Sequence, residues 1–406
     1  MILHMQRTRN TITKSTFLIS LIVVLLLLAA VIFPGIYHTF FGDFPAEFDT
    51  PFELGHNAIL LIGINILIFG FGFIYYKNKF PSINTKIDQI RTFEIPKKVS
   101  LVVLLIILGT YAGFSSPELF LDEREQWGDY LILEDALKLW PDGKTDNLYV
   151  SEQLDRYVRM GLLVASQEIF QNIKFLPFIA SILVVFSTYL LTVQLTGKRF
   201  AGIIAMLVLL QSHLFLTFDT IAVYENFWVL FYMVSLLAIK KGWMLSPIFY
   251  ILSVFTKAFV APFFVMTLYS VYRSEIEKRK KYYLFISYIA IVVIALLIII
   301  IGATLYTDIL EVNPSQFFIG FADTALQFRY DLFFVTMLLP VIVGLYVLSK
   351  HSPNSDIIHA LIAGTIIFGP ILVMSTYFYE ILAYRYVPTL IFFSIGMGMF
   401  FAKKSN

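Results

Sequence analysis

The sequence predicts an all-α, polytopic membrane protein with about twelve transmembrane helices. Hydrophobic residues make up 58% of its 406 positions and charged residues only 14%, whereas soluble domains are about 25% charged. Phe occurs 41 times and Tyr 23 times, which is typical of lipid-facing surfaces and of the aromatic belts at membrane interfaces. Long apolar runs also recur along the whole chain, and each run is a candidate span.

A helix needs about 20 apolar residues to cross a bilayer core about 30 Å thick. The runs that reach or approach this length are 16–34, 57–76, 98–114, 173–193, 200–217, 226–239, 283–305, 331–349, 357–378 and 386–402. The first of them lacks a small-x-small cleavage pattern, so we interpret it as a retained span and not as a signal peptide. A further stretch, 244–272, is interrupted by Lys257 and fits either one long span or two short helices, 244–256 and 258–272.

The positions of Lys and Arg decide between these two interpretations, because basic residues beside a span stay on the cytoplasmic side. Arg7 and Lys14 place the N-terminus in the cytoplasm. If 244–272 crossed the membrane once, the basic run 278–281 would lie outside, against this rule. A hairpin returns the run to the cytoplasm, and every later loop then agrees. We therefore predict a hairpin with Lys257 near the outer face, in a multi-pass protein of the cell membrane with both termini cytoplasmic.

The longest segment between predicted spans, 115–172, lies on the outer side in this arrangement. It contains two predicted amphipathic helices, 124–140 and about 150–171. In the first helix, apolar side chains that include Trp127 and Trp140 recur with helical spacing. Helices of this kind lie in the plane of the membrane interface. We expect them to cover a cavity at the outer end of the bundle.

These features divide the chain into three regions. The first has two N-terminal spans and a cytoplasmic loop, the second has the outer loop and the hairpin, and the third has the C-terminal spans. Their boundaries are 1–97, 98–282 and 283–406.

Several classes of chemistry are excluded by composition. The chain has no Cys, so disulfides, thiolate catalysis and Cys-ligated metal clusters are excluded. Its six His show no metal-ligand spacing, and we predict no metal site and no bound cofactor. The formal net charge is +2, too small to indicate a nucleic-acid partner. We expect membrane lipid to surround the protein.

The acidic candidates for chemistry lie at the outer ends of predicted spans. Asp122 and Glu123 follow the third span, and Asp219 and Glu225 flank a short outer loop. A carboxylate in such a position can act as a general base on an acceptor hydroxyl or amine. It can equally be a solvated or helix-capping acid, and the residues alone leave both roles open.

The basic candidates lie on the same side. A charge within an apolar stretch is costly, so Lys257 requires a cavity, a partner or a ligand. An anionic phosphate is one such ligand, held by Lys as a point charge and by Arg through a bidentate fork. The alternatives for Lys257 are snorkelling to the lipid headgroups or a pair with Asp219 or Glu225. The same roles are open to Arg329 and Arg385. These two residues can also anchor the protein at the aromatic interface.

Several of these residues belong to short motifs that follow one another in a recognisable order. The motifs are Phe120-Leu121-Asp122-Glu123 directly after a span, Arg159-Met160-Gly161-Leu162-Leu163 before the next span, Thr256-Lys257 in the hairpin, and Arg385-Tyr386-Val387-Pro388 at the last span. In their order and sidedness they resemble the GT-C superfamily of integral membrane glycosyltransferases. The resemblance is to the branch with dolichyl-phosphate-mannose protein mannosyltransferases and aminoarabinose transferases, and it covers about 98–272 and 380–402.

The resemblance implies an enzyme that moves a sugar from a polyprenyl- or dolichyl-phosphate donor to an acceptor on the non-cytoplasmic face. Asp122, beside Glu123, would be the base that activates the acceptor, and Asp219 or Glu225 would orient the acceptor. The donor phosphate would be held by three cations: Lys257, Arg385 and Arg329. The resemblance requires no metal, although a divalent ion bridging Asp122 and the phosphate is compatible with it. The acceptor, whether protein, lipid or glycan, is not specified.

The chain also departs from this family, and other classes of function stay open. Two spans precede the matching segment, and the Trp-Trp-Asp-Tyr-Gly signature of oligosaccharyltransferases is absent. The alternatives are a non-catalytic membrane subunit and a transporter or flippase of a lipid-linked sugar. A transporter would need polar groups across the whole bilayer, whereas the candidates here gather at one face.

Overall fold

The structure is a computed structural model that is all-helical, and the all-α prediction is confirmed. It describes residues 2–42, 50–77, 79–124, 127–140, 157–303, 312–349, 354–374 and 382–402, which contain no β-strand. Within these ranges, six helices are long and apolar enough to cross a membrane. The predicted number of about twelve spans is not confirmed. Some residues used for predictions, including 150–156, Lys403 and Lys404, lie outside the described ranges.

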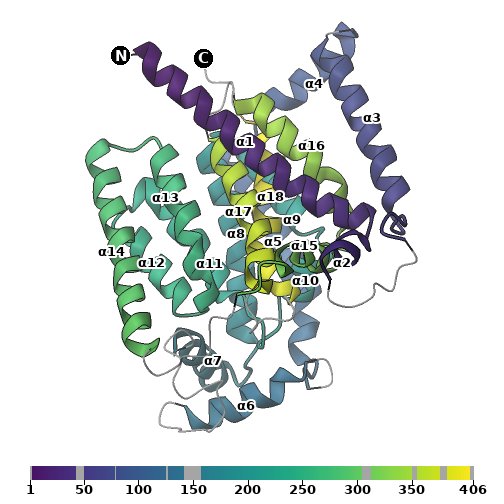
Figure 1. The fold of residues 1–406 in the computed structure, drawn as a ribbon. Helices are drawn as coiled ribbons and strands as arrows, with labels where there is room; N and C mark the ends of the chain where they lie inside the picture. Colours follow the sequence, from purple (N-terminus) through teal and green to yellow (C-terminus); the bar gives the residue numbers. More distant parts are fainter. Residues whose placement is uncertain are drawn as a thin grey trace.

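The six long helices differ in how much of their surface the rest of the chain covers. They are α1 (Ile2–Ile32), α3 (Ala58–Tyr76), α5 (Lys97–Ser115), α8 (Phe175–Thr196), α16 (Leu332–Ser349) and α17 (Ser355–Val373). α3 lies at the periphery (Figure 1), and Ile59 and Phe71 of α3 and Phe114 of α5 are largely exposed. Large apolar side chains turned outward along long helices are the pattern of a membrane protein.

The centre of the bundle is formed by α8, α17 and three shorter helices, α9 (Arg199–Leu209), α11 (Phe227–Lys241) and α18 (Val387–Met399). Every residue of α18 except Met397 is buried. Close helix packing requires small residues at the contact. At Gly398 of α18 a Cβ atom would lie 2.6 Å from the carbonyl oxygen of Ala201 in α9, so a larger residue would force the two helices apart.

The predicted span 200–217 is divided in the structure, and its prediction as one helix is wrong. After α9 the chain turns at 210–212 and begins the short helix α10 (His213–Thr217). Ser212 is the N-cap of α10, and its hydroxyl accepts the backbone N–H of Phe215 at 3.1 Å. Ser is a preferred N-cap residue because its side chain satisfies an N–H group that has no partner within the helix. The polar cap therefore explains where the apolar run breaks.

The structure also divides 244–272, as the hairpin interpretation predicts. The first half is α12 (Leu245–Val254), and the second half is η3 (Ala258–Phe263) followed by α13 (Phe264–Arg273). Ser246 pairs with Ser235 of α11, and Ser253 bonds the carbonyl oxygen of Trp228. These contacts make α12 antiparallel to α11.

The second half of the hairpin runs in the other direction. The Phe259 ring contacts Trp228 near the beginning of α11, and the Phe263 ring contacts Tyr232 one turn later. η3 and α13 are therefore parallel to α11 and antiparallel to α12. Lys257 lies at the turn between the two halves. The long helix α14 (Lys278–Ala303) follows α13.

Three helices were not predicted from the sequence: α2 (Ile36–Phe41), α4 (Pro81–Thr92) and α15 (Gln316–Gln327). α15 falls between the predicted spans 283–305 and 331–349, where the hydropathy pattern predicts no span. Instead it packs against α1 and α17. A Cβ atom at Gly320 of α15 would lie 2.5 Å from the Cα of Pro370 in α17. This close approach is possible because Gly has no side chain.

The remaining helices gather at one end of the bundle. They are η1 (Ser116–Phe120), α6 (Asp129–Leu139), α7 (Tyr157–Phe170) and η4 (Ala383–Tyr386). α6 and α7 lie at the end opposite the two chain termini, as Figure 1 shows. They correspond to the two predicted amphipathic helices, although α6 begins five residues later than the predicted helix 124–140.

Candidate functional site

A cluster of charged side chains lies near α7, at the same end of the bundle. Its members come from four separate parts of the chain: Arg159 from α7, Glu225 from the segment before α11, Lys257 from the hairpin turn, and Arg385 from η4. Glu225, Lys257 and Arg385 are candidates predicted from the sequence. We call these four residues, together with Tyr384, the charged cluster.

The centre of the charged cluster is the carboxylate of Glu225, which is fully buried. The Nε atom of Arg159 lies 2.8 Å from its Oε2 atom, and the Nζ atom of Lys257 lies 4.0 Å from the same oxygen. The side chains of these two bases are only 8% and 10% exposed. A buried charge is tolerated when it is paired. Arg159 and Glu225 therefore stabilise one another, and Lys257 adds a second positive charge to one carboxylate.

Two bases of the charged cluster, Lys257 and Arg385, also contact aromatic rings. The Nζ atom of Lys257 lies 4.8 Å from the centroid of the Tyr384 ring, and the guanidinium of Arg385 lies 5.3 Å from that of Phe259. Cations bind to aromatic faces through the ring quadrupole. Burial raises the pKa of Tyr384, but the positive charges of Lys257 and Arg385 outweigh it, and the net pKa lies below the ordinary value. The potential at this ring is therefore positive.

The charged cluster is connected to α6 through two tyrosines. The ring of Tyr224 stacks on that of Tyr384 with centroids 4.7 Å apart. The hydroxyl of Tyr224 donates a hydrogen bond of 2.9 Å to a carboxylate oxygen of Asp129, the first residue of α6. Asp129 is thus an acid near the charged cluster that is not among the site residues predicted from the sequence.

The two acids that open the outer loop have different environments. Asp122 is exposed, and its Oδ1 atom accepts the backbone N–H of Arg124 at 3.0 Å. Glu123 is only 2% exposed, and burial raises the pKa of its carboxyl. It accepts the backbone N–H of Ala222 at 2.9 Å and lies 3.5 Å from the Nζ atom of Lys174. Glu123 therefore attaches the loop to the segment before α11, whereas Asp122 is accessible.

Asp219 lies at a second buried contact between the same two segments. Its Oδ2 atom accepts a hydrogen bond of 2.9 Å from the Ser115 hydroxyl. One residue further along the chain, Thr220 donates to Glu118 at 3.1 Å. Burial raises the pKa of Asp219 from 3.8 to about 7. No contact of Asp219 with the charged cluster is found among the described residues.

The raised pKa of Asp219 gives the stability of the protein a pH dependence. Between about pH 4 and pH 7 the folded chain keeps a proton that the unfolded chain has lost, so stability falls as pH rises and levels off above 7. Asp219→Asn lacks this dependence. Relative to the variant, the wild type should lose up to roughly 4 kcal/mol of unfolding free energy across this range, at about 1.4 kcal/mol per pKa unit.

Unfolding in denaturant at pH 4.5, 6 and 8 measures this effect. The difference between wild type and Asp219→Asn isolates Asp219, because the other titrating groups, including Glu123, are common to both chains. A difference that stays constant with pH would show that Asp219 titrates near its ordinary value in the folded chain.

Arg329 lies apart from the other predicted bases. It follows α15, and its guanidinium lies 4.8 Å from the ring centroid of Tyr330. It lines a cavity formed with α1, α3 and α16. Within the described ranges, no ion pair or ring contact connects Arg329 with the charged cluster. The structure therefore does not bring together all three cations that the resemblance assigns to one phosphate.

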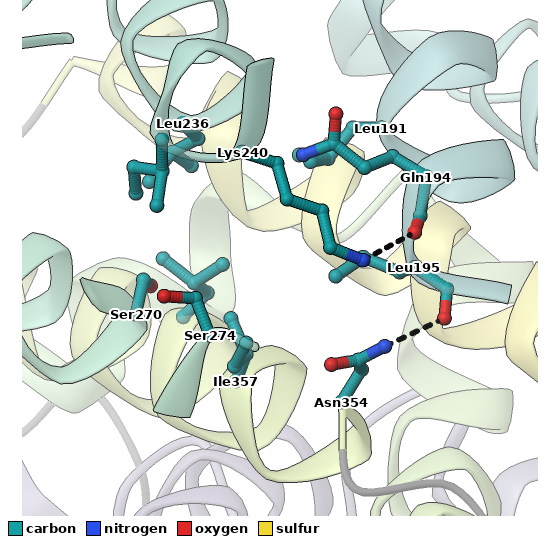
Figure 2. A pocket seen from close by; sticks show the side chains of 11 residues that line it. Leu191, Gln194, Leu195, Leu236, Lys240, Ser270, Ser274, Asn354 and Ile357 are labelled. Carbon is teal, nitrogen blue, oxygen red and sulfur yellow. Dashed lines mark hydrogen bonds between the residues drawn. The ribbon is translucent and has the colours of Figure 1, made fainter. Parts of the chain in front are cut away.

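A small pocket is found near the ends of α8, α11, α13 and α17. Figure 2 shows Lys240 donating to the carbonyl oxygen of Gln194 and Asn354 donating to that of Leu195. Its volume is about 30 Å³, room for about two or three water molecules when each needs about 10–15 Å³. Its walls are mostly apolar side chains, including Leu236 and Ile357. A pocket of this size does not hold a substrate.

Two members of the charged cluster were not predicted as site residues, Arg159 and Tyr384. In the sequence, Arg159 belongs to the motif Arg159-Met160-Gly161-Leu162-Leu163, and Tyr384 directly precedes Arg385. An available signal was a lone Arg in an otherwise apolar part of an amphipathic helix, since such a charge needs a buried partner. Among the described residues, no group of three or more His, Asp or Glu is placed to hold a metal ion.

Comparisons with known proteins do not identify a family for this chain. No protein-family model matches the sequence. No curated protein and no solved structure matches it either.

Proposed function

We propose that the protein is a glycosyltransferase of the GT-C type, which moves a sugar from a polyprenyl-phosphate donor to an acceptor on the non-cytoplasmic face of the membrane. The observation that supports this function best is the pairing of Arg159 and Lys257 with the single buried carboxylate of Glu225. The charged cluster lies near α7 and connects to α6 through Tyr224, where the sequence predicts a cover over a cavity. In this proposal the chain crosses the cell membrane about twelve times, with both termini cytoplasmic.

The charges of the cluster favour an anionic ligand. Among the described residues, Arg159 and Lys257 pair with the carboxylate of Glu225, and Arg385 lies beside Tyr384. The four ionisable side chains of the charged cluster carry a formal net charge of +2 (3 − 1). A phosphate monoester or diester near Lys257 and Arg385 would balance this charge. Because the side chains are held by ion pairs and aromatic rings, they are oriented before the ligand binds. Oriented charges of this kind stabilise the charge that develops in a transition state.

The proposed reaction transfers the sugar in one displacement. A carboxylate takes the proton from the acceptor hydroxyl or amine, and the acceptor atom forms a bond to the anomeric carbon of the sugar. The bond between that carbon and the phosphate oxygen breaks, and its electron pair leaves with the polyprenyl phosphate. Lys257 and Arg385 would stabilise the negative charge on the leaving phosphate. Asp122 is the proposed base, because its carboxylate is exposed whereas that of Glu123 is buried and bonded. Glu225 would orient the cations.

Transfer of radiolabelled sugar from a panel of polyprenyl-phosphate donors by the purified protein tests this function. Asp122→Asn should lower the transfer rate by roughly 10²–10⁴-fold, the typical contribution of a general base. Asp135→Asn is the matched control, since this α6 carboxylate is 71% exposed and pairs only with Lys138 among the described residues. It should transfer at the wild-type rate.

Asp129→Asn extends the same experiment to the acid that contacts Tyr224. If Asp129→Asn loses turnover and Asp122→Asn does not, the base is Asp129 and the enzyme class stands. If the folded wild type shows no turnover with any donor, the proposed enzymatic activity is contradicted. That result would favour a membrane subunit or a transporter.

A further inference from the structure

A cavity of about 390 Å³ lies between α1, α3, α15 and α16, away from the charged cluster. This volume falls within the range of roughly 300–1,000 Å³ that is usual for small-molecule sites. The walls are mainly apolar and include Ala30, Leu61, Ala322 and Val335 from the four helices. The four helices lie outside 98–272 and 380–402, the segments that carry the GT-C resemblance, so the proposed transfer reaction does not account for the cavity.

Several polar residues of this cavity lie near the ends of helices. Arg329 lies two residues after the end of α15, and His56 and Asn57 precede the first residue of α3. His38 lies in α2, just after α1. Apolar residues line the cavity in the same region, including Ala30 near the end of α1 and Leu61 near the beginning of α3. The cavity therefore offers a charged group beside an apolar wall, and an amphiphile contacts both with its headgroup and its chain.

Arg329 supplies a positive charge to the cavity. Its side chain is exposed, and its guanidinium lies over the ring of Tyr330. Among the described residues, no carboxylate forms an ion pair with it. The planar guanidinium matches the geometry of a phosphate better than any other side chain does. Asp323, one to two turns earlier in α15, also lines the cavity and disfavours a headgroup with a second negative charge.

We propose that this cavity binds one membrane phospholipid with an amine-bearing headgroup, such as phosphatidylethanolamine. The phosphate lies on Arg329, the amine lies toward Asp323, and an acyl chain lies against Leu61 and Ala322. The lipid fills the space between α3 and the bundle, where α3 contacts α16 through the hydrogen bond from Asn65 to the Thr336 carbonyl oxygen. This site is independent of the proposed transfer reaction.

Native mass spectrometry of the detergent-purified protein, titrated with phosphatidylethanolamine, tests the site. The wild type should bind one molecule in preference to phosphatidylglycerol. Arg329→Gln should weaken this binding roughly tenfold or more, as expected for a lost hydrogen bond between charged groups. Ala322→Leu, which fills the cavity, should weaken it while Arg329 is intact. Arg124→Gln is the control, because Arg124 is an exposed arginine outside the cavity.

Two outcomes would overturn the proposal. Equal binding of phosphatidylethanolamine by the wild type, Arg329→Gln and Ala322→Leu would place the lipid elsewhere. Displacement of the lipid by equimolar polyprenyl phosphate, with loss of this competition in Arg329→Gln, would assign the cavity to an isoprenoid phosphate instead. The test does not depend on turnover, so a protein without transferase activity can still pass it.

Discussion

Lys257→Met should lower the rate of sugar transfer by about 10²–10³-fold, the usual cost of removing one electrostatic contact to a developing charge. The amine of Lys257 lies between the carboxylate of Glu225 and the ring of Tyr384. Met keeps most of the length of the unbranched side chain and removes the ammonium group. Arg159 remains 2.8 Å from Glu225, so the buried carboxylate keeps a partner and the variant should fold.

Steady-state kinetics with varied donor separates the two ways in which Lys257 can act. A fall in kcat with little change in KM means that the charge stabilises the transition state, whereas a rise in donor KM alone means that it binds the ground state. Lys257→Arg keeps the charge but not the shape of the ammonium group, and it should recover only part of the rate. Lys138→Met is the control, because this α6 side chain is 63% exposed. Unchanged turnover in folded Lys257→Met would show that the donor phosphate does not bind beside Lys257.

The hairpin shows which part of the fold the sequence could predict. Hydropathy alone permits one span at 244–272, but the basic run 278–281 requires the chain to return before it. The structure agrees, since α12 and α13 run in opposite directions. The positions of basic residues can be read from the sequence without knowledge of tertiary contacts. They therefore predict the hairpin, whereas the length of the apolar stretch fits both one span and two short helices.

The helix α15 shows the limit of the same reasoning. Its 12 residues are too few for a complete span, so a search for long apolar runs assigns them to a loop. α15 packs against α1 and α17, and Gly320 lies against Pro370 of α17. These residues are 50 positions apart, and nothing local in the sequence indicates that they meet.

The candidate site divides in a similar way. The sequence identifies Glu225, Lys257 and Arg385 one by one, because each is a charge at the edge of an apolar run. It does not identify their partners, since Arg159 reaches Glu225 only when α7 packs beside the segment before α11. It also groups Arg329 with Lys257, whereas the structure places Arg329 in a different cavity. Membership of a site is set by tertiary packing, which one sequence without relatives does not reveal.

Glu225→Gln should destabilise the folded protein by about 3–5 kcal/mol, the cost of leaving buried charges without their partner. The substitution preserves the shape of the side chain and leaves both Arg159 and Lys257 beside a neutral amide. The free energy of unfolding in denaturant is the quantity to measure. Glu134→Gln is the control, because Glu134 pairs with Arg124 at 3.0 Å but the two side chains are 32% and 52% exposed. Such surface pairs contribute about 0–1 kcal/mol.

The double variant Arg159→Met with Glu225→Gln distinguishes a lost ion pair from a general disturbance of packing. Removing Arg159 from the Glu225→Gln background takes away one of the two uncompensated cations, so the double variant should be more stable than the sum of the single changes predicts. An additive result would mean that the two side chains do not interact energetically. In that case the net charge of the cluster would not be concentrated around Glu225, and the electrostatic basis for a phosphate ligand at Lys257 would be lost even if the enzyme were active.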